Sequence, residues 1–157
     1  MAMKIRRLRS GDEAVIRWLA ARDADYDLEG RGHPRTPLNP EALRAYLANP
    51  AVLHWVAQEQ ERIDGFLQCV VIPLRAGAGE ELLLYEIGVH RDHRREGVGT
   101  ALVESMYVWM HEHRVDDVWV LADNPDAVSF YESVGFRVAD EMSTYMTAKS
   151  GERRSRP

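Results

Sequence analysis

A glycine-containing turn with two arginines lies at residues 94–100, Arg-Arg-Glu-Gly-Val-Gly-Thr. It joins an apolar run at residues 82–89 to a helical pattern that begins at Val98. Gly97 and Gly99 let the backbone approach an anion closely. The first amides of the helix and the positive end of its dipole attract negative charge. The turn therefore predicts a phosphate-binding site.

The turn lacks residues that two classes of nucleotide-binding site require. A P-loop site for a nucleoside triphosphate needs GxxxxGK[ST], and the turn lacks the lysine and serine pair of that motif. A dinucleotide site needs GxGxxG early in a βαβ unit, whereas this turn has only Gly97 and Gly99, more than halfway along the chain. Neither class is favoured. No His, Cys and Asp cluster has metal-ligand spacing, so no metal site is predicted.

Two carboxylates lie inside or directly after apolar runs of the sequence. Glu86 lies inside the apolar run that precedes the turn, and Asp123 follows the short apolar run at residues 118–122. A glutamate in a buried strand needs a partner or a task. Glu86 is therefore either a functional carboxylate or the partner of a core arginine. Asp123 is either functional or the cap of the helix that starts at Pro125.

An acidic cluster near the N-terminus suggests a cationic ligand. It consists of Asp23, Asp25, Asp27 and Glu29, with Tyr26 among them, in a chain whose net charge is −5. That charge disfavours general nucleic-acid binding, which relies on a basic face. A polyamine-like substrate would be attracted by the cluster. The alternative is a solvated helix end or loop.

Length and composition predict one globular domain. The 157 residues suffice to bury a core without disulfides or metals. The single cysteine, Cys69, lies in an apolar run and has no partner, which favours a core thiol and a reducing compartment. No segment reaches the roughly 18 apolar residues of a bilayer span, and the first residues lack the apolar region of a signal peptide. A cytoplasmic location is expected.

Hydrophobic periodicity and turn signals predict the elements that position these residues. A capping box at Ser10–Glu13 opens the first helix, and Asn39 with Pro40 opens the second. Asp64-Gly65 is a hairpin signal, residues 30–40 form a loop, and the basic tail at 149–157 is expected to be disordered. The expected strands are residues 4–9, 52–58, 66–72, 82–89, 118–122, 136–138 and 142–147, and the expected helices are residues 10–25, 40–48, 98–114 and 126–134.

The element order β-α-α-β-β-β-α-β-α-β-β resembles the GNAT acetyltransferase superfamily. The turn meets the superfamily's loop pattern [Q/R]-x-x-G-x-[G/A] at Arg94, Gly97 and Gly99. Residues 124–136 are similar to its element N-x-x-A-x-x-x-Y-x-x-x-G-F. The resemblance implies one α/β (α+β) domain over residues 1–148, a mixed central sheet of about seven strands flanked by about four helices.

The resemblance implies acetyl-CoA as cofactor. The turn would hold the pyrophosphate, the strand before it would pair with the pantetheine arm, and a bulge at Gly88 would aim an amide at the thioester oxygen. Tyr131 would be the general acid for the departing thiolate, its alternative being a core ring. The implied cofactor-binding residues are Ile87, Gly88, Val89, Arg94, Arg95, Glu96, Gly97, Val98, Gly99, Thr100, Asn124, Ala127, Phe130 and Tyr131.

Acetyl transfer requires a deprotonated amine, so a base is needed near the acetyl group. Within the resemblance, the candidate catalytic residues are Glu86 and Asp123 as bases and Tyr131 as acid. His90 and His93 either relay protons or are solvated turn residues. The residues expected to bind the substrate are Asp25, Tyr26, Asp27, Glu29, Glu86 and Asp123.

A narrower resemblance concerns the acceptor. Residues 71–73, 81–89, 93–95 and 122–123 are similar to the GNAT-type aminoglycoside 3-N-acetyltransferases. This implies transfer to an amino group of an aminoglycoside antibiotic. Two alternatives stay open: another cationic amine acceptor, such as a polyamine, an amino acid or a protein amine, and a non-catalytic acyl-CoA-binding regulator. Homodimers are common in the resembled family, and the last two expected strands are a candidate interface.

Overall fold

The computed structural model describes residues 2–26, 35–141 and 143–150. By its internal contacts the chain divides into two units, residues 1–122 and 123–157, and each is described by itself. The first unit contains β1 (Lys4–Arg7), α1 (Glu13–Ala21), α2 (Asp23–Tyr26), α3 (Pro40–Ala48), β2 (Val52–Glu59), β3 (Arg62–Pro73), β4 (Glu80–Val89), a 3-10 turn η1 (Arg91–His93), α4 (Val98–His113) and β5 (Val118–Trp119). The second unit contains α5 (Pro125–Ser133).

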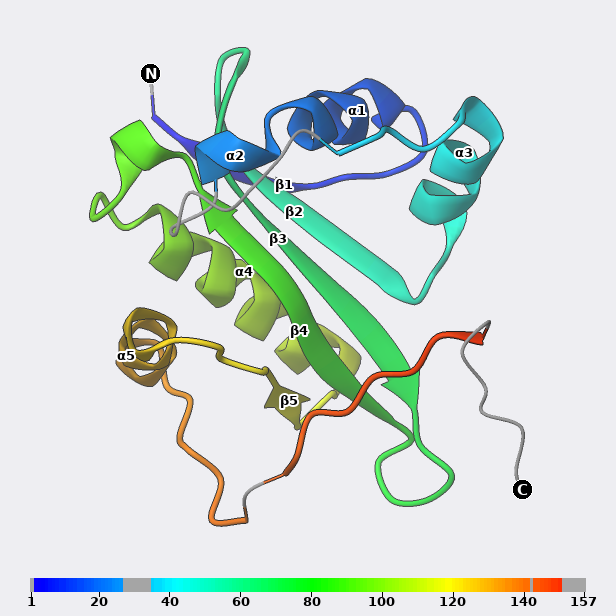
Figure 1. Cartoon of the computed structure of the whole chain (residues 1–157), viewed down its shortest axis with the longest axis vertical. Helices are drawn as coiled ribbons and strands as arrows, with labels where there is room; N and C mark the ends of the chain where they lie inside the picture. Colours follow the sequence, from blue (N-terminus) through cyan, green and yellow to red (C-terminus); the bar gives the residue numbers. More distant parts are fainter. Residues whose placement is uncertain (1, 27–34, 142, 151–157) are drawn as a thin grey trace. The chain divides into compact units, whose positions relative to one another are not determined.

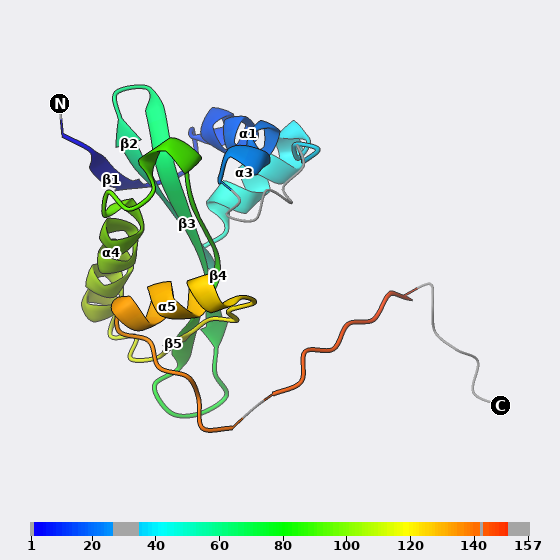
Figure 2. The ribbon, with the colours of Figure 1, turned by 60° about the vertical axis from the view of Figure 1, so that its left-hand side comes forward.

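The first unit is built on one mixed sheet with the strand order β1-β2-β3-β4-β5. The first three pairings are antiparallel, and β4 with β5 is parallel. Helix α4 covers one face of the sheet, and α1, α2 and α3 lie on the other (Figures 1 and 2). The α/β fold class is thus confirmed, and among the described residues the sheet has five strands rather than about seven.

Helix α4 packs through the apolar stripe that its sequence predicts. Val98, Leu102 and Met106 are buried, whereas Val108 on the opposite side is exposed. The stripe lies against the sheet where β3 has Gly65, because a Cβ there would come within 2.9 Å of the Val98 Cγ1 atom. Gly65 therefore lets α4 and the sheet approach closely.

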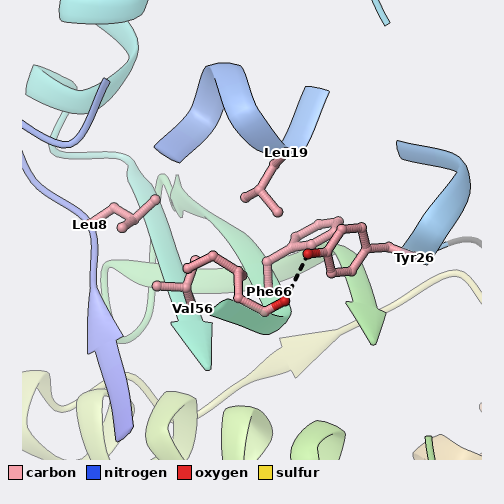
Figure 3. Packing of buried hydrophobic residues seen from close by; sticks show 6 residues of the cluster. Leu8, Leu19, Tyr26, Val56 and Phe66 are labelled. Atoms are coloured by element: carbon pink, nitrogen blue, oxygen red, sulfur yellow. Dashed lines mark hydrogen bonds between the residues drawn. The ribbon is translucent and has the colours of Figure 1, made fainter. Parts of the chain in front are cut away.

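The opposite face of the sheet holds a second apolar cluster (Figure 3). Tyr26 of α2 lies at its centre, 4% exposed, and its hydroxyl donates to the Ile63 carbonyl oxygen at 2.8 Å. Tyr26 was expected to contact substrate, but its ring packs edge-on against Phe66 and its only hydroxyl is engaged in the core. Tyr26 is therefore a core residue that fixes α2 on the sheet. The cluster consists of Leu8, Leu19, Tyr26, Val56, Ile63 and Phe66.

Two local turn predictions are wrong. The first helix begins at Glu13 with Asp12 in the N-cap position, and Ser10 does not cap it. The hairpin between β2 and β3 turns at Gln60, whose φ is +55°, so Asp64 and Gly65 lie inside β3. Gly65 is needed for the close approach of α4, and this requirement, not a turn, explains the glycine of the Asp-Gly pair.

The C-terminal strands predicted from sequence are absent from the described residues. β5 has two residues rather than five, and residues 136–141 and 143–150 form no strand. Val138, Tyr145 and Met146 are all exposed, so this segment gains little apolar burial to offset the ordering of its backbone. Residues 151–157 of the predicted tail lie outside the described residues, and the single domain over 1–148 stays a prediction.

Candidate active site

Strand β4 is irregular at Tyr85. Gln68 of β3 pairs with Glu86, and the next residue, Cys69, pairs with Leu84, so Tyr85 has no residue opposite it. Such a bulge bends a strand and re-aims its side chains. The expected bulge at Gly88 therefore lies three residues earlier, beside Glu86. A glycine is required at position 88 by packing instead, because a Cβ there would lie 2.6 Å from Phe66 Cε1.

Glu86 faces a guanidinium and a second carboxylate. Its Oε1 accepts a hydrogen bond from Arg35 Nη2 at 3.0 Å, and Arg35 Nε lies 3.1 Å from Asp23 Oδ2. Arg35 is 58% exposed, so it is a surface arginine rather than the core partner considered from sequence. Burial raises the pKa of the Glu86 carboxyl, Arg35 lowers it, and the charge of Asp23 raises it, with a net increase. A carboxylate with a raised pKa is better suited to accept a proton near neutral pH.

Polar side chains extend from Glu86 across the sheet in register. His54 of β2 pairs with Gln68 of β3, which pairs with Glu86. The His54 Nδ1 atom lies 2.9 Å from the Tyr46 hydroxyl of α3, and burial lowers the pKa of His54 to about 4, so its imidazole is neutral at pH 7. Burial, followed by the charge of Glu86, raises the pKa of Tyr46. This group could not be predicted from the sequence, since Tyr46 fits the apolar spacing of its helix and His54 lies in an apolar strand.

The acidic cluster of the N-terminal region is engaged in ion pairs where it is described. Asp25 pairs with Arg91 of η1, and Asp23 pairs with Arg35. Next to Asp25, the Tyr26 ring packs edge-on against the His90 ring, with centroids 5.5 Å apart. Helix α2 is thus connected to the turn that precedes α4. Asp27 and Glu29 lie outside the described residues.

The glycine turn before α4 has the backbone geometry of an anion site. Gly97 is the N-cap in the left-handed region, with φ +82° and no side chain to cap the helix. The Ala101 amide donates to the Gly97 carbonyl oxygen, so the amides of Val98, Gly99 and Thr100 precede the first helical bond. These amides fit a phosphate group.

Two side chains of this turn, those of Arg94 and Glu96, contact residues that precede the turn. Arg94 Nε donates to the Val89 carbonyl oxygen at 3.4 Å, and Arg95 is exposed with φ +62°. The Glu96 Oε2 atom lies 3.0 Å from His93 Nδ1. Glu96 therefore faces His93, and its contribution to a phosphate would come from the backbone.

The edge of β4 that faces away from β3 is paired only at its start. β5 pairs with Leu82 and Leu83, and no further strand of the first unit's described residues continues the ladder toward Val89. Ile87 and Val89, the residues expected to bind pantetheine, lie on this part of β4. An extended ligand can add to such an edge as a strand would.

In the second unit, Asn124 caps α5. Its Oδ1 accepts from the Ala127 amide at 2.8 Å, and its Nδ2 donates to Asp123 Oδ1 at 2.9 Å. The cap is therefore Asn124 rather than Asp123. Tyr131 is 8% exposed, and its ring centroid lies 5.4 Å from those of both Phe130 and Phe136. The roles predicted for these residues stay predictions.

The described residues contain neither a candidate membrane span nor a candidate metal site. No helix among them has the length and apolar character that a bilayer span requires. In the same part of the chain, no group of three or more His, Cys, Asp or Glu side chains is placed to hold a metal ion.

A bulged β4, a parallel β5 paired only at its start and a glycine turn at the N-terminus of α4 define the acyl-CoA N-acyltransferase class of fold. The model of the Acetyltransferase (GNAT) family matches residues 15–136. The chain belongs to this family.

The curated relatives are similar over part of their length. The [Ribosomal protein bS18]-alanine N-acetyltransferase of Escherichia coli (strain K12) is 34% identical over 74 residues, which are 46% of this chain and 50% of the relative. N-acetyltransferase 8B of Homo sapiens is 22% identical over 69% of this chain and 49% of its own length. The chain spans about half the length of these relatives.

Solved structures share the fold over nearly the whole chain. An aminoglycoside acetyltransferase from an uncultured soil metagenomic sample, in complex with sisomicin, has a TM-score of 0.80 at 22% identity, covering 94% of this chain and 97% of that one. A predicted acetyltransferase from Clostridium acetobutylicum with acetyl-CoA has a TM-score of 0.72 at 17% identity, covering 92% and 96%.

Proposed function

We propose that the protein is an acetyl-CoA-dependent N-acetyltransferase that acetylates an amino group of an aminoglycoside, at the 3-N position by resemblance. The observation that carries the proposal is Glu86, a half-buried carboxylate of raised pKa beside the β4 bulge. It lies on the strand that leads into the glycine turn, where helix amides fit a phosphate.

The residues present fit acetyl-CoA, the cofactor that members of this family use. The amides of Val98, Gly99 and Thr100 would hold the pyrophosphate, with Arg94 and Arg95 adding positive charge. Ile87, Gly88 and Val89 would bind the pantetheine arm along the edge of β4. From the second unit we propose Asn124, Ala127 and Phe130 as further contacts, on the resemblance of their motif. When bound, the cofactor supplies an acetyl group activated as a thioester.

Glu86 is the proposed general base. An alkyl ammonium must lose a proton before its nitrogen can attack a carbonyl carbon. Oε1 of Glu86 accepts from Arg35, so we assign the proton to Oε2. Asp123 is the second candidate base, and the Tyr131 hydroxyl is the proposed proton donor to the sulfur that leaves.

The acceptor is proposed to be a polycation. Glu86 and Asp23 bind the guanidinium of Arg35 between them, and this pair of carboxylates supports a cationic ligand at this part of the surface. The net charge of −5 favours the approach of such a substrate. An N-terminal alanine of a protein is the second candidate acceptor, because the 34% identical relative acts on ribosomal protein bS18.

We also propose a cytoplasmic location, supported by the single cysteine. We further propose a homodimer, which light scattering would test.

Glu86→Gln tests the proposed base. Removing a general base lowers kcat by about 100- to 10,000-fold. The matched control is Glu80→Gln, which removes an exposed carboxylate at the start of the same strand and is expected to leave kcat unchanged. Steady-state kinetics with acetyl-CoA and gentamicin measure both variants. A Glu86→Gln enzyme with the kcat of the wild type contradicts the assignment.

A further inference from the structure

Asp64 is a buried carboxylate that the proposed reaction does not use. It is 3% exposed and lies on β3 just before Gly65. Asp64 lies beside residues 90–97, which we call the cofactor loop, and is close to His90 and His93 of that loop. We propose that Asp64 and His93 are positioning residues that hold the cofactor loop in the shape that binds the CoA pyrophosphate.

Both the side chain and the backbone carbonyl of Asp64 accept hydrogen bonds. Arg62 donates to the carboxylate through Nε at 2.5 Å and through Nη2 at 3.1 Å. The Asp64 backbone carbonyl accepts from the His90 amide at 2.8 Å. A buried carboxylate persists only with such charge-assisted partners. Asp64 thus gives the start of the cofactor loop a rigid attachment point on the sheet.

His93 connects this attachment point to the far end of the loop. Its Nε2 lies 3.7 Å from Asp64 Oδ1, and its Nδ1 lies 3.0 Å from Glu96 Oε2. Glu96 immediately precedes Gly97, the N-cap of α4. The imidazole therefore bridges the sheet and the residue next to the amides that would bind phosphate.

The loop needs such a bridge because part of its backbone is strained. Arg95 adopts φ +62°, a left-handed conformation that is unfavourable for a residue with a side chain. Strained residues persist where surrounding contacts determine them. His93 and Glu96 flank Arg95 closely in sequence, so their contact resists relaxation of the loop away from the binding shape.

The inference rests on acetyl-CoA as the cofactor of the proposed reaction, and it is tested with His93→Ala. We expect the Kd of CoA, measured by titration calorimetry, to rise about tenfold, and the KM of acetyl-CoA to rise with it while kcat stays unchanged. S-acetylpantetheine lacks the pyrophosphate, so its turnover by the variant is expected to equal that of the wild type. His111→Ala is the matched control, because His111 is exposed on α4 far along the helix from the loop.

Two further variants connect the effect to Asp64. His93→Gln keeps an N–H donor for Asp64 but loses the contact with Glu96, so it is expected to recover part of the CoA affinity. Asp64→Asn is expected to weaken CoA binding less in the His93→Ala background than in the wild type, since the two changes share the contact between His93 and Asp64. Unchanged CoA binding by His93→Ala, or equal losses with acetyl-CoA and S-acetylpantetheine, would overturn the inference. A wild-type protein that does not bind CoA would overturn both the inference and the proposed function.

Discussion

At Glu86, burial and two charged neighbours act on one carboxyl group. Burial and the Asp23 charge raise its pKa, and Arg35 lowers it. The sequence showed Glu86 as a carboxylate in an apolar strand, which was enough to single it out. It did not show Arg35, because residues 51 positions apart become partners only when the chain has folded. The Tyr46 and His54 pair was missed because each residue fits the apolar pattern of its own helix or strand.

Arg35→Gln tests the balance of charges around Glu86. Without the guanidinium the pKa of Glu86 rises further, because the one neighbour that lowers it is lost. A general base works when deprotonated, so activity rises with pH through this pKa. The acidic limb of the kcat–pH profile is therefore expected to move to higher pH. Arg44→Gln, an exposed arginine of α3, is the control. A limb that stays in place or moves to lower pH contradicts the assignment of Glu86.

Among the elements, β4 shows best what sequence patterns can and cannot predict. Apolar residues at the right spacing identified β4 and α4, and both are found close to the expected bounds. The position of the bulge depends on the pairing register with β3, which the sequence of β4 alone does not contain. The reason for Gly88 likewise lies in two other elements, since Phe66 and Tyr26 occupy the space of its missing side chain.

Gly88→Ala is expected to destabilise the first unit. The new Cβ would lie 2.6 Å from Phe66 Cε1 and 3.0 Å from Tyr26 Cβ, and overpacking of this kind costs about 1–3 kcal/mol. Urea denaturation measures the loss of unfolding free energy. In a Phe66→Leu background the same change should cost less, because the ring atom in conflict is absent. Wild-type stability of Gly88→Ala would show that β4 does not pack as described.

At the scale of the whole molecule, the family match extends from residue 15 to residue 136 and so includes parts of both units. The family and the α/β class could be predicted from two short motifs and the order of elements. The number of strands could not, because short segments such as residues 136–138 form strands only if they find a partner edge and enough apolar burial. The motifs describe the half of the reaction that binds CoA, and the acceptor is recognised by other residues.

The proposed reaction transfers acetyl from acetyl-CoA to an aminoglycoside amine. Its most direct test is to incubate the purified protein with acetyl-CoA and, separately, gentamicin, spermidine and a peptide with an N-terminal alanine, and to measure acetylated product by mass spectrometry. We predict monoacetylated gentamicin formed with a higher kcat/KM than either other product. Acetylation of spermidine or the peptide without any of gentamicin would contradict the proposed acceptor, and no acetylation of any amine would contradict the proposed activity.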